Sequence, residues 1–226
     1  MAAEHSQNIA KVLAKQILRT NASHRPYPSL MSFPGLSSKP YHNPDHFSFT
    51  KDFENNVGKI KEEYKSLKIA YGAKEDYEKQ KGEHTLNSGE WHWMNYVSKG
   101  HKIEELFKKH CPVTTSILEG ALGNDRLMTG TPFSYTFFST MQPKTSIKPH
   151  YGATNLKLRC HFPLFVPDEA FLRVAGDPRP WVEGKMIVFD DSYEHEAANL
   201  SDTEERVILL IDIWHPDLHR DEILEI

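Results

Sequence analysis

The chain has 226 residues, a formal net charge of −4 and a sequence pI near 6.3. This length suits one well-buried domain with a helical appendage, and the absence of a basic stripe argues against nucleic acid as a partner. The sequence has no apolar run of roughly 18 residues, no secretory signal and no disulfide framework, so we expect a cytoplasmic protein without a membrane partner.

The first third of the chain is predicted to contain two helical stretches separated by an extended segment. Apolar residues at helical spacing between residues 4 and 18 predict an amphipathic helix, and we treat residues 1–25 as a tail that could dock on the domain or on a partner chain to form an oligomer. Five prolines between His24 and Asp45 favour an extended segment that lies on the surface of the domain. The domain itself is predicted to span residues 26–226. Helical spacing returns from Phe47 to Lys68. The apolar stripe of this helix, which should cover one side of the core, consists of Phe49, Phe53, Val57, Ile60, Tyr64 and Leu67.

The middle of the chain marks a change from helices to strands. Residues 71–90 are charged and contain glycines, which predicts an exposed loop, and Trp91–Tyr96 predicts an aromatic strand. Two short helices are expected next, one from His101 to Lys109 and one that begins near Pro112. Short β-branched or aromatic runs then predict strands at 133–141, 156–166, 171–174, 185–189 and 206–214. The expected architecture is mainly β with N-terminal helices, in which a helical layer leans on an antiparallel β-barrel or jelly roll.

Two of the predicted strands carry arginines on a polar face. In the strand at 156–166, Lys157, Arg159 and His161 share one face because side chains alternate along a strand. In the last strand, Arg206 heads the face opposite a continuous apolar one. Either arginine alone could be a surface or ion-paired residue. If these faces point into a barrel, however, an unpaired guanidinium would cost several kcal/mol, and a bound anion would compensate for it.

Two histidines are candidate metal ligands. His150 follows a proline and His195 lies in an Asp-Ser-Tyr-Glu loop, both beside β-type segments. Two neutral imidazoles suit a divalent metal such as Fe(II), and a nearby arginine could bind a dicarboxylate in bidentate fashion. The chain has thirteen histidines, so a turn or loop role explains either residue as well. A facial triad would place a carboxylate two residues after His150, but this position is Gly152, which would leave the third site open to water.

The acidic residues near His195 are not expected to bind metal. Glu194 and Glu196 flank the histidine and should point away from it in an extended segment. Asp190 and Asp191 precede a serine, a pattern typical of turn residues whose side chains bond backbone amides.

Several motifs together resemble the aspartyl/asparaginyl β-hydroxylase family. They occur in the order found in that family, and the similarity is strong from about Ser139 onward. The motifs are HYGATN at 150–155, LRCH at 158–161, WVEGK at 181–185, FDDSYEHE at 189–196, Arg206 and DIWHP at 212–216. The resemblance implies a double-stranded β-helix, a jelly-roll or cupin-like fold, for the domain at 26–226. It also implies an oxygenase that uses Fe(II), 2-oxoglutarate and O2.

The same resemblance implies a set of site residues. In the family two histidines hold iron and a glycine stands at the carboxylate position, which assigns His150 and His195 as metal ligands and explains Gly152. The positions that match the cosubstrate site are Ser139 and Arg206 at the distal carboxylate of 2-oxoglutarate, Arg159 and His161 near the cosubstrate and its metal-bound carboxylate, and Met141 in the pocket.

The function implied is hydroxylation of an Asp- or Asn-type residue, or a related small molecule, at an unactivated carbon, with release of succinate and CO2. The substrate is expected to be a small molecule or a peptide. A different class of function, a non-catalytic metal- or ligand-binding β-barrel acting as a sensor or interaction module, is the alternative. A two-histidine zinc hydrolase is less favoured, because catalytic zinc usually has three protein ligands.

Overall fold

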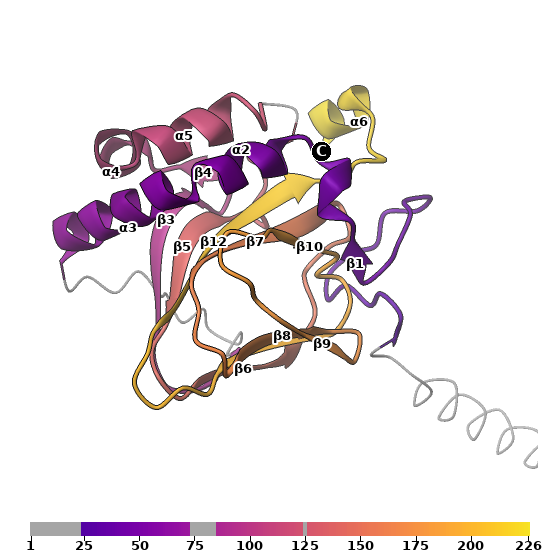
Figure 1. The fold of residues 1–226 in the computed structure, drawn as a ribbon. Helices are drawn as coiled ribbons and strands as arrows, with labels where there is room; N and C mark the ends of the chain where they lie inside the picture. Colours follow the sequence, from indigo (N-terminus) through magenta and orange to yellow (C-terminus); the bar gives the residue numbers. More distant parts are fainter. Residues whose placement is uncertain (1–23, 73–84, 124–125) are drawn as a thin grey trace, which may run out of the picture.

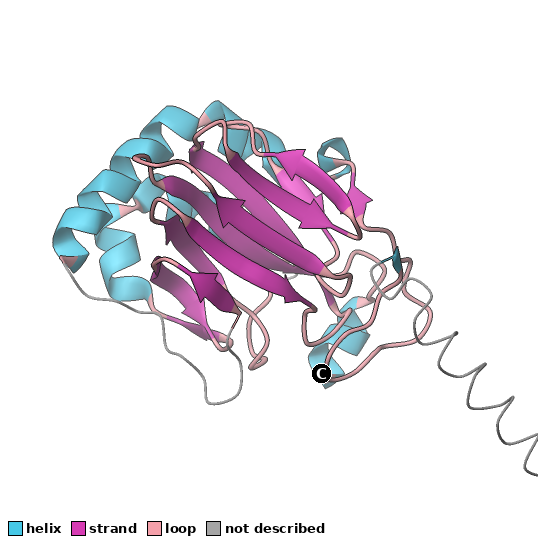
Figure 2. Cartoon of the chain, turned by 90° about the horizontal axis from the view of Figure 1, so that it is seen from below, coloured by secondary structure: helices cyan, strands magenta, loops and turns pink. Residues whose placement is uncertain are grey.

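The computed structural model describes residues 24–72, 85–123 and 126–226. The predicted helix at 4–18, its docking to a partner and most of the predicted loop at 71–90 lie outside these residues. The described chain forms three layers, in which helices cover one face of a larger sheet and a smaller sheet lies against the other face (Figures 1 and 2). This is the mainly β, double-stranded β-helix architecture that we expected.

The larger sheet is antiparallel throughout. Over the described residues it has seven strands in the order β1 (Tyr41–His42), β10 (Ile187–Phe189), β7 (Lys157–Phe165), β12 (Arg206–Trp214), β5 (Thr136–Met141), β3 (Trp91–Ser98) and β4 (His101–Lys102).

The smaller sheet closes the other side of the barrel (Figure 1). Within the same residues it has five strands in the order β2 (Leu86–Ser88), β6 (Thr145–His150), β11 (His195–Asn199), β8 (Ala170–Val174) and β9 (Asp177–Pro180).

Four helices pack on the outer face of the larger sheet, and a fifth is near the C-terminus (Figure 1); these are the helices of the described residues. They are α2 (Phe49–Asn55), α3 (Val57–Tyr71), α4 (Glu104–His110), α5 (Pro112–Glu119) and α6 (Arg220–Glu225), and a short 3-10 turn, η2 (Pro44–His46), precedes α2. None of the described helices combines the length and the apolar composition that crossing a bilayer requires.

The alternation predicted for the two central strands is confirmed, and it positions the site. The apolar faces of β7 and β12 pack against α2 and α3 in the main core, which includes Phe53, Ile60, Leu67, Leu158, Cys160, Phe162, Val207, Leu209, Ile211 and Ile213. The opposite faces, which carry Arg159, His161 and Arg206, point into the barrel toward the smaller sheet.

Some boundaries differ from the predictions. The single helix expected from Phe47 to Lys68 is two helices, because Asn56 leaves helical geometry (φ −113°, ψ 13°) and its side chain donates to the carbonyl of Asp52 at 2.8 Å. The helix expected from His101 begins three residues later, after the two-residue strand β4. Three residues of the expected loop at 71–90 form β2.

The strands that the sequence did not predict include β6 and β11, which carry the two histidines. β6 contains two β-branched residues, Thr145 and Ile147, but also serine, lysine and proline, and β11 (HEAAN) contains none, so neither has the composition typical of strands. Pro149 has no N–H to donate, and it is accommodated because the pairing of the two strands is irregular between His195 and Ala197.

Candidate active site

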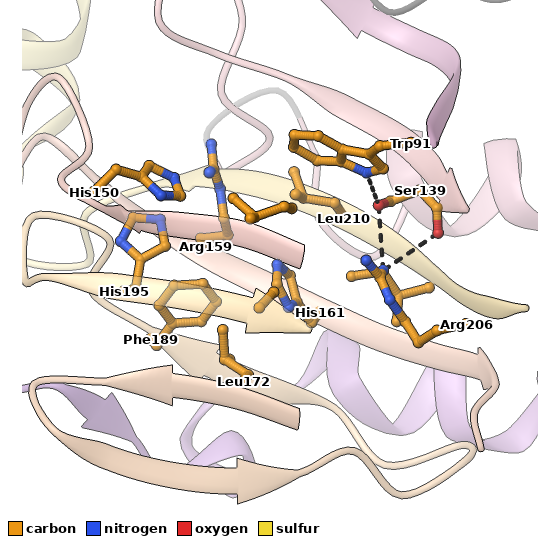
Figure 3. Close-up of a pocket in the computed structure, with 13 residues that line it drawn as sticks. Trp91, Ser139, His150, Arg159, His161, Leu172, Phe189, His195, Arg206 and Leu210 are labelled. Carbon is orange, nitrogen blue, oxygen red and sulfur yellow. Dashed lines mark hydrogen bonds between the residues drawn. The ribbon is translucent and has the colours of Figure 1, made fainter. Parts of the chain in front are cut away.

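Strand pairing brings together two histidines that are 45 residues apart in the sequence. His150 ends β6 and His195 begins β11, and the two residues are direct partners in the antiparallel ladder. Side chains of directly opposed residues project from the same face of a sheet. The two imidazole rings consequently lie side by side, with centroids 4.1 Å apart, at one end of the barrel interior (Figure 3).

Hydrogen bonds determine which nitrogen of each ring is available to a ligand. The Nδ1 atom of His150 lies 2.7 Å from the carbonyl oxygen of Lys148, and that of His195 lies 2.9 Å from the carbonyl oxygen of Tyr193. Because a carbonyl only accepts, each Nδ1 donates and each Nε2 keeps its lone pair. Burial lowers the pKa of both imidazoles, so both are neutral near pH 7. Two such rings suit a borderline divalent ion such as Fe(II).

A carboxylate occupies the space beside Gly152. A Cβ atom added at Gly152 would lie 2.5 Å from Oδ1 of Asp191, so no larger residue fits unless Asp191 moves. The Gly152 N–H also donates to the Asp191 carbonyl oxygen at 2.6 Å. Asp191 lies in a turn, as predicted, but the predicted bonding of its side chain to backbone amides is wrong, because its carboxylate contacts Lys157 and Arg159 inside the barrel.

The other acidic residues near His195 behave as predicted. Asp190 accepts a hydrogen bond of 2.9 Å from the main-chain N–H two residues later, as a turn residue does. Glu194 and Glu196 both contact Arg173, at 3.7 and 2.6 Å, and Arg173 does not line the pocket described below. Their carboxylates therefore point away from the imidazole of His195.

Four buried charges form a balanced network next to the two histidines. Asp212 accepts hydrogen bonds from Lys157 at 2.7 Å and from two nitrogens of Arg159 at 2.8 and 3.0 Å. Asp191 lies 3.2 Å from the Lys157 ammonium and 3.4 Å from the Arg159 guanidinium. Burial alone would lower the pKa of Arg159, but Asp212 and Asp191 raise it overall. Arg159 is thus compensated by carboxylates of the chain itself, and needs no bound anion.

Arg206 has a different environment, with no acidic side chain beside it among the described residues. It is only 1% exposed, and its guanidinium donates to the carbonyl and hydroxyl oxygens of Ser139 at 3.3 and 3.2 Å. It lies 4.8 Å from the centre of the Trp181 ring, and its Nε has no hydrogen-bond partner. Burial lowers the pKa of Arg206 to about 9. A buried cation without a counter-ion is costly, so Arg206 is the group in this site best suited to receive a carboxylate.

His161 presents a donor to the same space. Its Nδ1 lies 3.3 Å from Nε1 of Trp181, and because an indole N–H only donates, Nδ1 of His161 accepts and Nε2 carries the proton. Burial lowers the pKa of His161 well below its usual value, and its Nε2 has no hydrogen-bond partner among the described residues. His161 is therefore a neutral hydrogen-bond donor, the opposite tautomer to the two ligand candidates.

The three histidines, Arg159 and Arg206 line one pocket, whose space, counted out to its open mouth, is about 370 Å³ (Figure 3). Six of the seven residues predicted for the site line it: Ser139, His150, Arg159, His161, His195 and Arg206. The seventh, Met141, is fully buried in the apolar cluster behind the pocket and does not line it. The walls between the polar groups are apolar, and include Leu172, Phe189 and Leu210.

Several residues that shape the site were not identified from the sequence. Trp91 donates from its indole to the Ser139 hydroxyl at 2.8 Å, and Trp181 contacts both His161 and Arg206. The sequence signals for these roles were weak, because an aromatic residue in a strand is more often part of the core. Asp212 sits on the same strand face as Arg206, so alternation could have placed it inside the barrel.

Comparison with known proteins identifies similar sequences. The family described as Aspartyl/Asparaginyl beta-hydroxylase matches residues 54–216. "Aspartate beta-hydroxylase domain-containing protein 2" of Xenopus tropicalis is 34% identical over 195 residues, which cover 84% of this chain and 51% of that protein. "Aspartyl/asparaginyl beta-hydroxylase" of Mus musculus is 33% identical over 194 residues, which cover 84% of this chain and 25% of that protein. The chain therefore matches about half or less of the length of these relatives.

Among solved structures, a Pseudomonas putida prolyl-4-hydroxylase aligns with 80% of this chain and 92% of its own, at 14% identity and a TM-score of 0.39. Similarity at this level does not bear on the function of the site.

Proposed function

Because the chain belongs to the aspartyl/asparaginyl β-hydroxylase family, we propose that it is an Fe(II)- and 2-oxoglutarate-dependent oxygenase. One combination of features carries the proposal: two imidazoles with unprotonated Nε2 atoms share a pocket with a buried guanidinium that has no acidic partner among the described residues. A divalent cation and a dianionic oxoacid complement these groups. The proposed reaction hydroxylates an Asp- or Asn-type residue, or a related small molecule, at an unactivated carbon and releases succinate and CO2.

Five polar residues of the pocket have roles in this proposal. His150 and His195 hold Fe(II) through Nε2, and their Nδ1–H bonds to backbone carbonyls fix the ring orientations. Arg206 and Ser139 bind the distal carboxylate of 2-oxoglutarate, and His161 donates from Nε2 to the carboxylate nearer the metal. When bound, Fe(II) with 2-oxoglutarate and O2 supplies the oxidising chemistry that the side chains lack.

The charge balance of the pocket supports the same ligands. The four charges of Lys157, Arg159, Asp191 and Asp212 cancel, and the imidazoles are neutral. Arg206 and a divalent metal together add three positive charges, of which 2-oxoglutarate neutralises two. The remaining positive charge favours a substrate that carries a carboxylate, in agreement with an Asp-type substrate.

The ligand assignment is tested by adding Fe(II) and 2-oxoglutarate to the protein without oxygen. We expect a weak visible charge-transfer band that disappears in His150→Ala and in His195→Ala. His92→Ala is the matched control, since this partly exposed histidine contacts Glu90 and does not line the pocket. A band that persists in both ligand variants would refute the assignment.

The alternative, a non-catalytic metal- or ligand-binding barrel, would give the same band without turnover. Release of succinate from 2-oxoglutarate across a panel of Asp- and Asn-containing compounds therefore separates the two proposals. A zinc hydrolase is less well supported, because the described residues contain no group of three or more His, Cys, Asp or Glu side chains suited to a metal ion.

A further inference from the structure

An N-terminal segment crosses the end of the barrel at which the two histidines meet. We call residues 27–33 the arm; Figure 1 shows this part of the chain beside β1 and β10, at the end of the two sheets. Its main-chain N–H groups donate to the loops next to the histidines. Tyr27 donates to the Ser192 carbonyl at 2.8 Å, and Ser29 donates to the Gly152 carbonyl at 2.8 Å.

The arm and the two histidine loops are joined to one another pairwise. The arm bonds the loop after His150 through Ser29 and the loop before His195 through Tyr27, and the two loops bond each other through the Gly152 N–H and the Asp191 carbonyl. Three main-chain hydrogen bonds therefore join the arm and the two loops to one another in a closed triangle. Gly152 takes part in two of them, and it lies two residues after His150.

Side chains reinforce the same junction. Asn155, in the loop after His150, accepts from the Phe33 N–H at 2.6 Å and donates to the Phe33 carbonyl at 2.9 Å. The ring of Tyr27 packs edge-on against Tyr151, the neighbour of His150, with centroids 5.8 Å apart. The arm thus contacts the His150 loop along most of its length.

The two loops begin where the sheet ends. The ladder between β6 and β11 ends at the pair formed by His150 and His195, so beyond this pair the two loops are no longer paired with each other as strands. The loop before His195 also accepts from the Ala175 N–H at 2.9 Å and donates to the Pro40 carbonyl at 3.1 Å, and the arm joins it to the loop after His150. A site with only two protein ligands has no third ligand to hold the first two at the correct spacing. Whatever fixes the loops therefore also fixes the geometry of the ligands.

We propose that the arm is a positioning element of the metal site, which holds the two histidine loops together and so sets the separation of the two imidazoles. This inference rests on the proposed function, because it requires that His150 and His195 bind a metal. Residues that orient metal ligands without touching the metal typically change its affinity by about 10- to 100-fold when they are altered. Coupling is reciprocal, so metal binding must in turn tighten the arm on the loops.

The first test uses variants of the full chain and Mn(II) as the probe. Ser29→Pro removes the N–H that bonds Gly152, while the control Ser29→Ala keeps it and loses only a 3.3 Å hydroxyl contact. Asn155→Ala removes both bonds to Phe33, with Asn56→Ala as a control on the helical layer. Calorimetry should show a Kd for Mn(II) that rises by about tenfold or more in Ser29→Pro and Asn155→Ala, and stays within about twofold in both controls. The melting temperature of the metal-free proteins shows whether each variant is folded.

The second test uses the unaltered protein, so it does not depend on how the variants fold. Amide hydrogen exchange, followed by mass spectrometry of peptides that cover residues 25–33, should slow by about fivefold or more when Mn(II) saturates the site. Unchanged exchange, or a Kd within about twofold of the unaltered protein in folded Ser29→Pro and Asn155→Ala, would overturn the role of the arm. The proposed function would survive that result if His150→Ala still abolished Mn(II) binding. If the unaltered protein bound no Mn(II), the role of the arm and the proposed function would both be refuted.

Discussion

Replacing Arg206 by methionine should stabilise the protein while it abolishes 2-oxoglutarate binding. Arg206 is 1% exposed, and its guanidinium donates to Ser139 and lies against the Trp181 ring, so the folded chain keeps a charge that no acidic group of the described residues balances. Methionine has a similar length and no charge, and it fills irregular apolar space well.

The size of the effect follows from the pKa. A fall from 12.5 to about 9 corresponds, at about 1.4 kcal/mol per pKa unit, to roughly 5 kcal/mol for holding the charge in the folded state. The pKa of Arg206 is lowered, so this cost is fully present below about pH 9 and disappears as the pH rises from there toward 12.5. The variant also loses the two hydrogen bonds to Ser139, which reduces the expected gain in stability by about 2 kcal/mol. The net gain at pH 7 is about 3 kcal/mol, or a rise in Tm of about 6 °C or more for a domain of this size.

Thermal melting at pH 7, with and without Mn(II) and 2-oxoglutarate, measures both effects. The unaltered protein should melt at a higher temperature with these ligands, whereas 2-oxoglutarate should add nothing to the Tm of Arg206→Met in the presence of Mn(II). Arg159→Met is the matched control, and it should be destabilised by about 3–5 kcal/mol because it leaves Asp212 and Asp191 partly uncompensated. The argument is refuted if Arg206→Met lowers the Tm of the ligand-free protein, or if its Tm still rises with 2-oxoglutarate.

Three further predictions concern packing, capping and pH. Gly152→Ala should lower the free energy of unfolding, measured by urea denaturation, by about 1–3 kcal/mol, because the added Cβ would lie 2.5 Å from a buried carboxylate. The control Gly58→Ala has nothing within 4 Å of the added Cβ and should raise this free energy by about 0.5–1 kcal/mol. Equal effects of the two substitutions would contradict a steric clash at Gly152. Glu63→Ala should lower the free energy of unfolding by about 2–3 kcal/mol in the same assay, because this buried carboxylate accepts hydrogen bonds from two main-chain N–H groups at the start of α5, at 2.6 and 2.9 Å. The control Glu62→Ala, at an exposed residue, should change it by no more than about 0.5 kcal/mol. A loss as small as that of the control would exclude the capping role of Glu63. Burial lowers the pKa of His42 to about 4, so between about pH 4 and 6.5 the unfolded chain binds a proton that the folded chain does not. The stability of the protein therefore falls as the pH drops through this range, and the plot of Tm against pH should be flatter there for His42→Phe. Parallel curves for the two proteins would show that His42 does not contribute.

Strand alternation, which is a local property, determined much of the barrel. The period of two in β7 and β12 predicted which side chains share a face, and the structure places the face of Arg159, His161 and Arg206 inside the barrel and the apolar face against the helices. β6 and β11 were not predicted because they contain proline and several polar residues. Strand propensity is weak evidence for a strand that forms one side of a pocket and carries few β-branched residues. The ends of helices were also missed where one residue, such as Asn56, interrupts a regular pattern.

The sequence by itself determined that Arg159 and His161 share one strand face and that Arg206 lies opposite an apolar one, because a side chain's face depends only on its position along its own strand. Only the tertiary structure decided that His150 and His195 are cross-strand neighbours, and that Arg159 is neutralised while Arg206 is not. These outcomes depend on partners that are tens of residues away in the sequence, such as Asp212 for Arg159. Which partners meet is set by how the strands pair and how the sheets pack, and the local pattern carries no information about either.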